Sequence, residues 1–103
     1  MSPITPKIKA FLDIQKLGFV ATVSSTGKPN ISPKGTIIAW SKNSLAFANI
    51  RSPDTMTNLQ NNPFVEINVI DPLSRKGYLF MGTGKIIKDT TVYDDILRYY
   101  RNN

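Results

Sequence analysis

Two short segments combine hydroxyl, basic and proline residues in a pattern that suits the binding of an anion. One is residues 32–36 (Ser-Pro-Lys-Gly-Thr), and the other is residues 48–55, which include Arg51 and Ser52. Ser52 is a favourable N-cap and Pro53 suits the first helical position, so we expect a helix to begin there, directly after a strand. The backbone N–H groups of a helix N-terminus attract anions, and Arg51 adds a positive charge beside them. The pattern predicts a phosphate site, although an ordinary capped helix after a strand would show the same residues.

The chain contains neither Cys nor His. This composition excludes disulfides, thiolate nucleophiles, zinc sites built on cysteine and catalytic triads that use imidazole. We therefore expect no metal site. Chemistry carried by an organic cofactor stays compatible with the composition, because the cofactor itself transfers the electrons.

The size and net charge of the chain limit the kinds of molecule that it is expected to bind. Its 103 residues, of which 41% are hydrophobic, predict one domain that spans residues 1–103. The net charge is +6, from 13 basic and seven acidic residues. This excess fits a nucleic acid, a phosphorylated cofactor or an acidic metabolite, but also a lysine-rich surface without such a role. The basic residues are spread along the chain, which weakens the nucleic-acid interpretation.

The sequence also bears on location. Residues 1–17 mix Lys and Pro with apolar residues and lack the continuous apolar core of a signal peptide. No apolar run approaches the roughly 18 residues that a membrane span needs. We therefore expect a cytoplasmic protein that does not contact a membrane.

The predicted elements form a mainly β fold with flanking helices (α+β). We expect a helix after Thr5-Pro6 that Gly18 closes, a second helix over residues 52–62 and a third over residues 92–100. Apolar and β-branched runs predict strands at residues 19–23, 30–40, 45–48, 64–70 and 78–87. Pro33 and Gly35 interrupt the second of these strands and imply an edge, a bend or a bulge, and Gly82 and Gly84 break the last. Short turns between successive strands indicate an antiparallel sheet, which would curl into a small barrel to avoid long free edges.

Several segments, taken in order, resemble the pyridoxamine 5′-phosphate oxidase-like flavin-binding proteins, in particular their short, general members. The resemblance rests on residues 17–23, 27–30, 32–35, 49–53, 62–63, 77–78 and 82–84. It covers residues 8–88, and no single motif decides it. The family implies a small antiparallel split β-barrel of the FMN-binding type. It also implies a homodimer with FMN in a cleft where the two subunits meet.

The resemblance also implies which residues contact the cofactor. The flavin ring is expected along Ser32, Pro33, Lys34, Gly35 and Thr36, and the ribityl chain and phosphate near Asn49, Ile50, Arg51, Ser52 and Thr55. Reduced flavin gathers negative charge at its N1 and C2-carbonyl end, and a nearby cation such as Lys34 would stabilise that form. A plain surface lysine on a strand is the alternative interpretation of Lys34.

Two departures from the family pattern affect these expectations. Many relatives carry a second basic residue early in the helix, where this chain has Pro53 and Asp54. Arg51 and Lys34 would then supply the positive charge at the phosphate. Relatives also continue past the last helix into a further strand, so either this chain is truncated at its C-terminus or a partner subunit completes the barrel.

The leading hypothesis is an FMN-dependent oxidoreductase that passes electrons or hydride between a reduced pyridine nucleotide and an unknown acceptor. The small-molecule substrate and any catalytic side chain are unknown from the sequence. One alternative is a basic barrel that binds single-stranded nucleic acid, which the placement of the aromatic residues among aliphatic ones disfavours. Another is a module that binds a flavin or deazaflavin without catalysis, which Asp54 keeps open.

Overall fold

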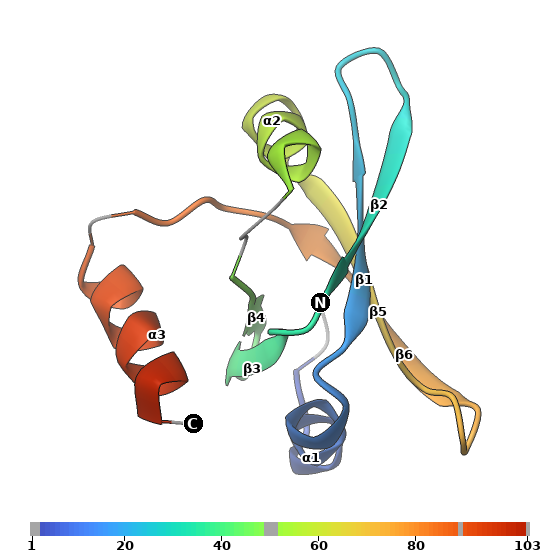
Figure 1. Cartoon of the computed structure of the whole chain (residues 1–103), viewed down its shortest axis with the longest axis vertical. Coiled ribbons are helices and arrows are strands. Elements are labelled where there is room, and N and C mark those ends of the chain that lie inside the picture. Colours follow the sequence, from blue (N-terminus) through green and yellow to red (C-terminus); the bar gives the residue numbers. More distant parts are fainter. Residues whose placement is uncertain (1–2, 49–51, 89, 103) are drawn as a thin grey trace.

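An antiparallel sheet of four strands forms the centre of the molecule (Figure 1). The computed structural model describes residues 3–48, 52–88 and 90–102. In this part of the chain the helices are α1 (Pro6–Gln15), α2 (Pro53–Asn61) and α3 (Thr91–Asn102). The strands are β1 (Gly18–Val23), β2 (Pro29–Lys34), β3 (Ile38–Ser41), β4 (Ser44–Ala46), β5 (Phe64–Asp71) and β6 (Lys76–Thr83). The predicted α+β class with mainly antiparallel strands is confirmed.

The sheet has the order β2-β1-β5-β6, and β3 and β4 form a separate hairpin. The strand expected over residues 30–40, with an interruption at Pro33 and Gly35, is in fact two strands, because β2 and β3 belong to different sheets. The chain leaves the sheet after Lys34, and the Ile37 N–H then donates to the Lys16 carbonyl at 3.2 Å. Ile37 is fully buried at this corner. In the described residues no strand of one sheet is hydrogen-bonded to a strand of the other, so the barrel is split rather than closed.

Two predicted element ends also differ. Helix α1 ends at Gln15 and Lys16 is its C-cap, with a φ of +52° and an N–H that donates to the Leu12 carbonyl at 3.0 Å. Gly18 is therefore not its cap and instead begins β1. Strand β6 stops at Thr83, between the two glycines that were expected to break the strand over residues 78–87, and no described strand pairs with residues 84–88.

The predicted start positions of α1 and α2 are confirmed, although only the first has a side-chain capping bond. The Thr5 hydroxyl accepts a hydrogen bond from the Ile8 N–H at 3.2 Å, and Pro6 occupies the first turn of α1. Helix α2 begins at Pro53 with Ser52 at the N-cap position. Both starts depend on local sequence, which explains why they were predictable.

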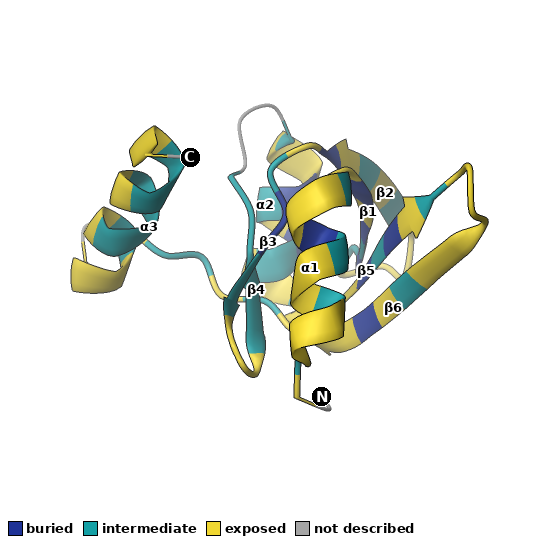
Figure 2. Cartoon of the chain, turned by 90° about the horizontal axis from the view of Figure 1, so that it is seen from below, coloured by how far each residue is buried: buried dark blue, intermediate teal, exposed yellow. Residues whose placement is uncertain are grey.

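The core lies on one face of the sheet, beneath α1 and α2 (Figure 2). It consists of Leu12, Val20, Ile37, Ile67, Val69 and Phe80. Since strand side chains alternate between faces, the residues between these core positions point to the opposite face. That outer face carries the exposed side chains of Phe19, Ile31, Phe64, Leu79 and Met81. None of the described helices is long and apolar enough to span a membrane.

One buried polar contact joins α2 to the sheet. The Asn58 side-chain amide donates to the Thr22 hydroxyl at 3.0 Å, and both residues are buried. We expect Thr22→Val to lower the free energy of unfolding by about 1–3 kcal/mol, because the Asn58 amide loses its acceptor away from water. Chemical denaturation measures the change. Thr83→Val, at an exposed strand end, is the control and should change stability little; equal effects would contradict a role for the buried contact.

Candidate functional site

Three predicted site residues meet where β2 faces the start of α2. Ser32 and Lys34 are two residues apart on β2 and therefore share its inner face. The Ser32 and Ser52 hydroxyl oxygens are 2.8 Å apart, and the Lys34 ammonium donates to the Ser52 hydroxyl. The sequence predicted all three residues, and the structure brings them together from positions 18 to 20 residues apart along the chain.

Lys34 is the unusual member of this cluster, since only 7% of its surface is exposed. Among the described residues it forms no ion pair. Burial lowers the pKa of Lys34 from its ordinary value of 10.5, because the charged form loses hydration. A buried ammonium that contacts the Ser52 hydroxyl instead of a carboxylate would be stabilised by a bound anion. The interpretation of Lys34 as a plain surface lysine is therefore wrong.

The start of α2 adds a second source of positive potential. The Ser52 side chain makes no capping bond to the helix. In the first turn, backbone N–H groups have no partner within the helix, and the helix dipole places partial positive charge there. Asp54 lies in the same turn and is exposed to solvent. The Lys34 ammonium and the start of α2 thus contribute positive potential at the same place.

Thr36 belongs to a second cluster. Its hydroxyl accepts a hydrogen bond from the Ala48 N–H at 3.0 Å, and its carbonyl accepts one from the Tyr100 hydroxyl at 2.6 Å. Burial raises the pKa of the Tyr100 phenol. Beside this contact, Trp40 and Tyr99 meet edge to face with ring centroids 6.3 Å apart. Tyr99 and Tyr100 thus hold α3 against the β3 end of the molecule.

The remaining predicted residues are distributed differently. Pro33 and Gly35 are exposed, and Pro33 lies on the outer face of β2, away from the Lys34 cluster. Thr55 is fully buried in α2, and its hydroxyl has no hydrogen-bond partner among the described residues. Three further predicted residues, Asn49, Ile50 and Arg51, lie outside the described residues.

Sequence reasoning did not anticipate the role of Tyr100. The apolar and aromatic spacing of α3 indicated a packed face, but nothing in the sequence paired this face with Thr36, which lies 64 residues earlier. The contact depends on where residues 84–88 carry α3, and this path follows from tertiary structure alone.

The architecture agrees with comparisons to known proteins. A family model described as pyridoxamine 5′-phosphate oxidase matches residues 4–103. This chain belongs to the pyridoxamine 5′-phosphate oxidase family. The predicted family and split-barrel fold are therefore confirmed, while the bound cofactor is a separate question. A comparison with curated proteins finds no match.

Solved structures of other family-like proteins share this fold. HupZ from Group A Streptococcus is 29% identical, with a TM-score of 0.87, over 96% of this chain and 78% of HupZ. A Lactobacillus delbrueckii protein, provisionally assigned as a pyridoxamine 5′-phosphate oxidase, is 18% identical, with a TM-score of 0.83, over 95% of this chain and 80% of that protein. HutZ, described as the heme storage protein from Vibrio cholerae, is 21% identical, with a TM-score of 0.78, over 97% of this chain and 75% of HutZ. The last two are similar in fold alone.

Proposed function

We propose that this member of the pyridoxamine 5′-phosphate oxidase family binds FMN and places the phosphate at Ser32, Lys34 and Ser52. The observation that carries the proposal is Lys34, a buried ammonium beside two hydroxyls with no ion pair among the described residues. A phosphate dianion would supply the missing negative charge and accept hydrogen bonds from all three side chains. The backbone N–H groups at the start of α2 would add further donors.

The activity that we propose is an oxidoreductase reaction between a reduced pyridine nucleotide and an acceptor. When bound, FMN supplies the hydride or electron transfer. The chain itself would hold the phosphate, offer the backbone of residues 32–36 to the flavin ring and limit access of water. Because FMN would carry out the electron transfer and the chain would only bind and position it, the reaction does not require Cys or His, which this chain lacks.

A homodimer forms part of the same proposal. The outer face of the sheet exposes large apolar side chains: Ile31 is 67% exposed, Phe64 69% and Met81 60%. An apolar surface of this kind is typical of a protein interface. A second copy of the chain would cover it, and sedimentation should therefore find a dimer. The cluster of Ser32, Lys34 and Ser52 lies on the inner face of β2, so a cleft shared between subunits requires the second copy to reach around β2 to this cluster. A monomer that binds FMN tightly would contradict the shared cleft.

Heme is the main competing cofactor, because HutZ, which shares this fold, is described as a heme storage protein. Histidine and cysteine are common axial ligands of heme iron, and this chain supplies neither. A deazaflavin or a nucleic acid would also fit a basic site. The lack of His and Cys favours FMN over heme, whereas the cluster of Ser32, Lys34 and Ser52 does not separate them, because heme propionates are also anions.

The test compares FMN with riboflavin, which has the same ring and ribityl chain but no phosphate. We expect the purified or reconstituted protein to show the absorption bands of oxidised flavin and to release FMN on denaturation. Calorimetry should find FMN bound about 100-fold more tightly than riboflavin, which corresponds to roughly 2.7 kcal/mol from charge-assisted hydrogen bonds. Equal affinities would overturn the phosphate site. A colourless protein that FMN cannot reconstitute, or a heme spectrum, would overturn the cofactor assignment.

Arg51 gives a further test of the phosphate site, chosen on its sequence position beside the α2 start. We expect Arg51→Ala to weaken FMN binding by about 1.5–3 kcal/mol, the range for one lost charge-assisted hydrogen bond. Riboflavin binding should not change, because riboflavin lacks the phosphate. Lys28→Ala removes an exposed basic residue in the β1–β2 turn and serves as the control. An unchanged FMN dissociation constant in Arg51→Ala would remove this residue from the site.

A further inference from the structure

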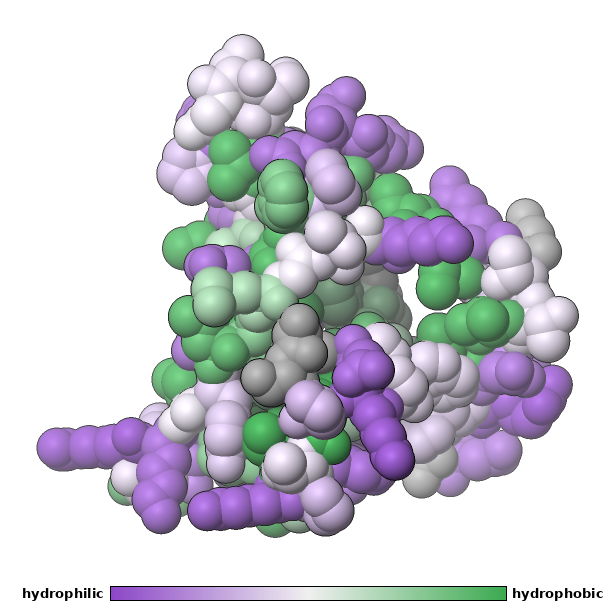
Figure 3. Space-filling model, turned by 180° about the vertical axis from the view of Figure 1, so that it is seen from behind, coloured by the Kyte–Doolittle hydropathy of each residue, from purple (hydrophilic) through white to green (hydrophobic). Residues whose placement is uncertain are grey.

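Helix α3 is held to the rest of the molecule over a limited area. Figure 3 shows an open gap between α3, on the right of the view, and the body of the molecule. No described residue of the helix is fully buried. Residues 84–88, which lead to it, pair with no described strand. The contacts that do join α3 to the body therefore decide where the helix lies.

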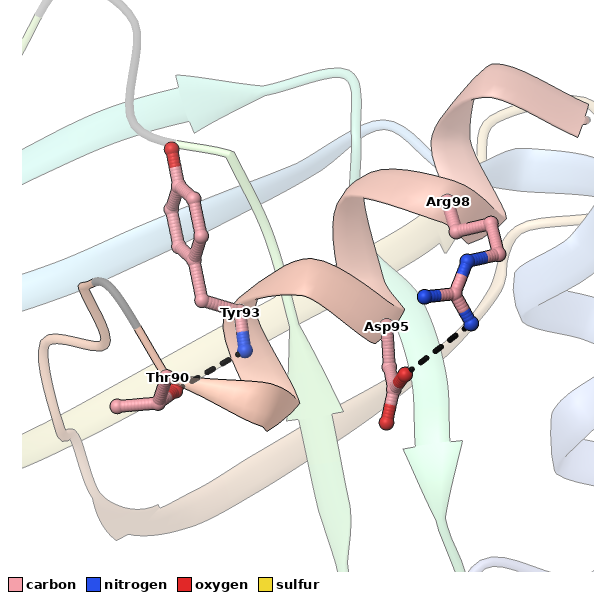
Figure 4. A network of polar contacts seen from close by, with 4 residues as sticks. All are labelled: Thr90, Tyr93, Asp95 and Arg98. Carbon is pink, nitrogen blue, oxygen red and sulfur yellow. Dashed lines mark hydrogen bonds and ion pairs between the residues drawn. The ribbon is translucent and has the colours of Figure 1, made fainter.

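Some polar contacts of α3 stabilise the helix without attaching it to the body. The Thr90 hydroxyl accepts a hydrogen bond from the Tyr93 N–H at 3.1 Å, and Arg98 pairs with Asp95 at 3.4 Å (Figure 4). All four residues belong to the helix or to its start. These contacts explain why α3 forms, but not where it docks.

The C-terminal half of α3 makes the contacts that reach the body. The Tyr100 hydroxyl donates to the Thr36 carbonyl at 2.6 Å, although the two residues are 64 positions apart in the sequence. The Tyr99 ring meets Trp40 of β3 edge to face, with ring centroids 6.3 Å apart. Both contacts reach the part of the body formed by the corner after β2 and by the β3–β4 hairpin. The end of α3 is therefore docked there.

Thr36 connects Tyr100 to a second segment of the body. The Thr36 hydroxyl accepts a hydrogen bond from the Ala48 N–H at 3.0 Å and donates one to the Ala48 carbonyl at 3.4 Å. One side chain thus satisfies both backbone groups of a residue 12 positions later. Thr36 lies just before β3 and Ala48 just after β4, so this pair closes the base of the β3–β4 hairpin.

The base of this hairpin leads directly to the proposed phosphate site. Lys34 is two residues before Thr36, and Ser52 is four residues after Ala48. The Lys34 ammonium donates to the Ser52 hydroxyl. The same two segments therefore meet twice within a short length of chain. Because each residue extends the chain by at most about 3.6 Å, a shift of Thr36 relative to Ala48 would also change the spacing of Lys34 and Ser52.

We propose that Tyr100 is a positioning residue of the FMN site. Its bond to the Thr36 carbonyl holds Thr36 against Ala48, and this pair sets the spacing of Lys34 and Ser52. This role rests on the proposed phosphate site, and it makes α3 a regulator of that site. Docking of α3 and binding of FMN are then coupled, and each strengthens the other by the same factor. Tyr100 acts through Thr36 and does not need to touch the cofactor.

The first test requires no cofactor. Tyr100→Phe keeps the ring and removes the hydroxyl, so hydrogen exchange of the Ala48 amide, measured by NMR, should become about tenfold faster. The fluorescence of Trp40, the single tryptophan of the chain, should change as well, because Tyr99 docks against it less often. Tyr93→Phe, at the opposite end of α3, is the matched control and should leave both signals unchanged. Unchanged Ala48 exchange in Tyr100→Phe would overturn the proposal.

The second test measures the effect on the phosphate site. Tyr100→Phe should weaken FMN binding about tenfold and riboflavin binding by less, because riboflavin has no phosphate. In a Lys34→Met background, Tyr100→Phe should have little further effect on FMN affinity, since the ammonium that it positions is gone. Tyr93→Phe should bind FMN as the parent does. Equal weakening of both ligands in both backgrounds would indicate a general loss of structure and would overturn the proposal.

Together the two tests separate the role of Tyr100 from the proposed FMN site. If Lys34→Met weakens FMN binding and Tyr100→Phe does not, the FMN site stands and Tyr100 does not position it. If the parent protein binds no FMN, the proposed function is wrong and the effect of Tyr100 on FMN affinity is wrong with it. Faster Ala48 exchange in Tyr100→Phe would then show that Tyr100 holds only the base of the hairpin.

Discussion

Replacing Lys34 by methionine is expected to weaken FMN binding by about 10- to 100-fold. The fold-change corresponds to about 1.4–2.7 kcal/mol, as expected when one charge-assisted hydrogen bond to a phosphate is lost. Methionine has an unbranched side chain of similar shape to that of lysine, and it is apolar and therefore compatible with a buried position. Without FMN, the variant should be more stable than the parent, because the lysine it replaces is buried without an ion pair among the described residues.

The titration of Lys34 predicts opposite pH trends for the stability of the protein and for its affinity for FMN. The pKa of Lys34 in the folded protein lies below its ordinary value of 10.5. Between the lowered value and 10.5, the unfolded chain binds more protons than the folded chain, so stability without ligand rises with pH. FMN binding has the opposite trend, because the phosphate needs the protonated ammonium. FMN affinity should therefore fall as pH rises through the lowered pKa of Lys34, and both trends attributable to this residue should disappear in Lys34→Met.

The control is Lys76→Met, which removes an exposed lysine at the start of β6. It should leave FMN affinity, its pH profile and stability nearly unchanged. Calorimetric titration with FMN and with riboflavin, together with chemical denaturation across the alkaline range, provides the readouts. If Lys34→Met lowers stability and leaves FMN binding intact, the lysine is a structural residue and the phosphate lies elsewhere.

The parts of the site that depend on residues close together in the sequence were predictable, and the parts that depend on tertiary packing were not. Ser52 and Pro53 act on their own helix start, and this local signal placed α2 correctly. The family pattern placed Ser32 and Lys34 at the same site as Ser52. The burial of Lys34 was not predictable, because it depends on α2 packing against β1 and β2. A lysine on a strand is normally exposed, and nothing else in the sequence around Lys34 indicates that its side chain is buried.

The errors in the predicted fold have the same origin. Residues 30–40 have the composition of one strand interrupted at Pro33 and Gly35, but the chain leaves β1 after Lys34 and the Ile37 N–H donates to the Lys16 carbonyl instead. Residues 84–87 have strand-like composition, yet no neighbouring strand pairs with them. Strand existence was therefore predictable from residue type, whereas strand ends depended on partners distant in the sequence.

Glycine is required at position 18 for a different reason from the one predicted from the sequence. Its position after the first helix suggested a cap, where glycine supplies a positive φ. Lys16 fills that role instead, and Gly18 begins β1. A Cβ at Gly18 would lie 2.6 Å from the Ile37 Cδ1 atom and 2.8 Å from the Asn68 carbonyl oxygen. Glycine is thus required because the sheet and the corner at Ile37 approach one another closely.

We expect Gly18→Val to lower the free energy of unfolding by about 3 kcal/mol or more, at or above the upper end of the range for overpacked cores. Gly18→Ala should have a smaller but clear effect of about 1–3 kcal/mol. The Ile37 side chain has freedom to move, but the Asn68 carbonyl belongs to β5 beside β1 and can shift only if the ladder distorts. Chemical denaturation of the two variants measures the series.

Gly82→Ala is the matched control, because Gly82 is also a strand glycine and a Cβ there would meet nothing within 4 Å. That substitution should be neutral or should stabilise the protein by up to about 1 kcal/mol, since it reduces the backbone entropy of the unfolded chain. Opposite signs at the two glycines would show that close approach, and not glycine flexibility, is required at Gly18. Equal destabilisation at both positions would refute the contact argument and indicate that a general property of strand glycines controls the effect.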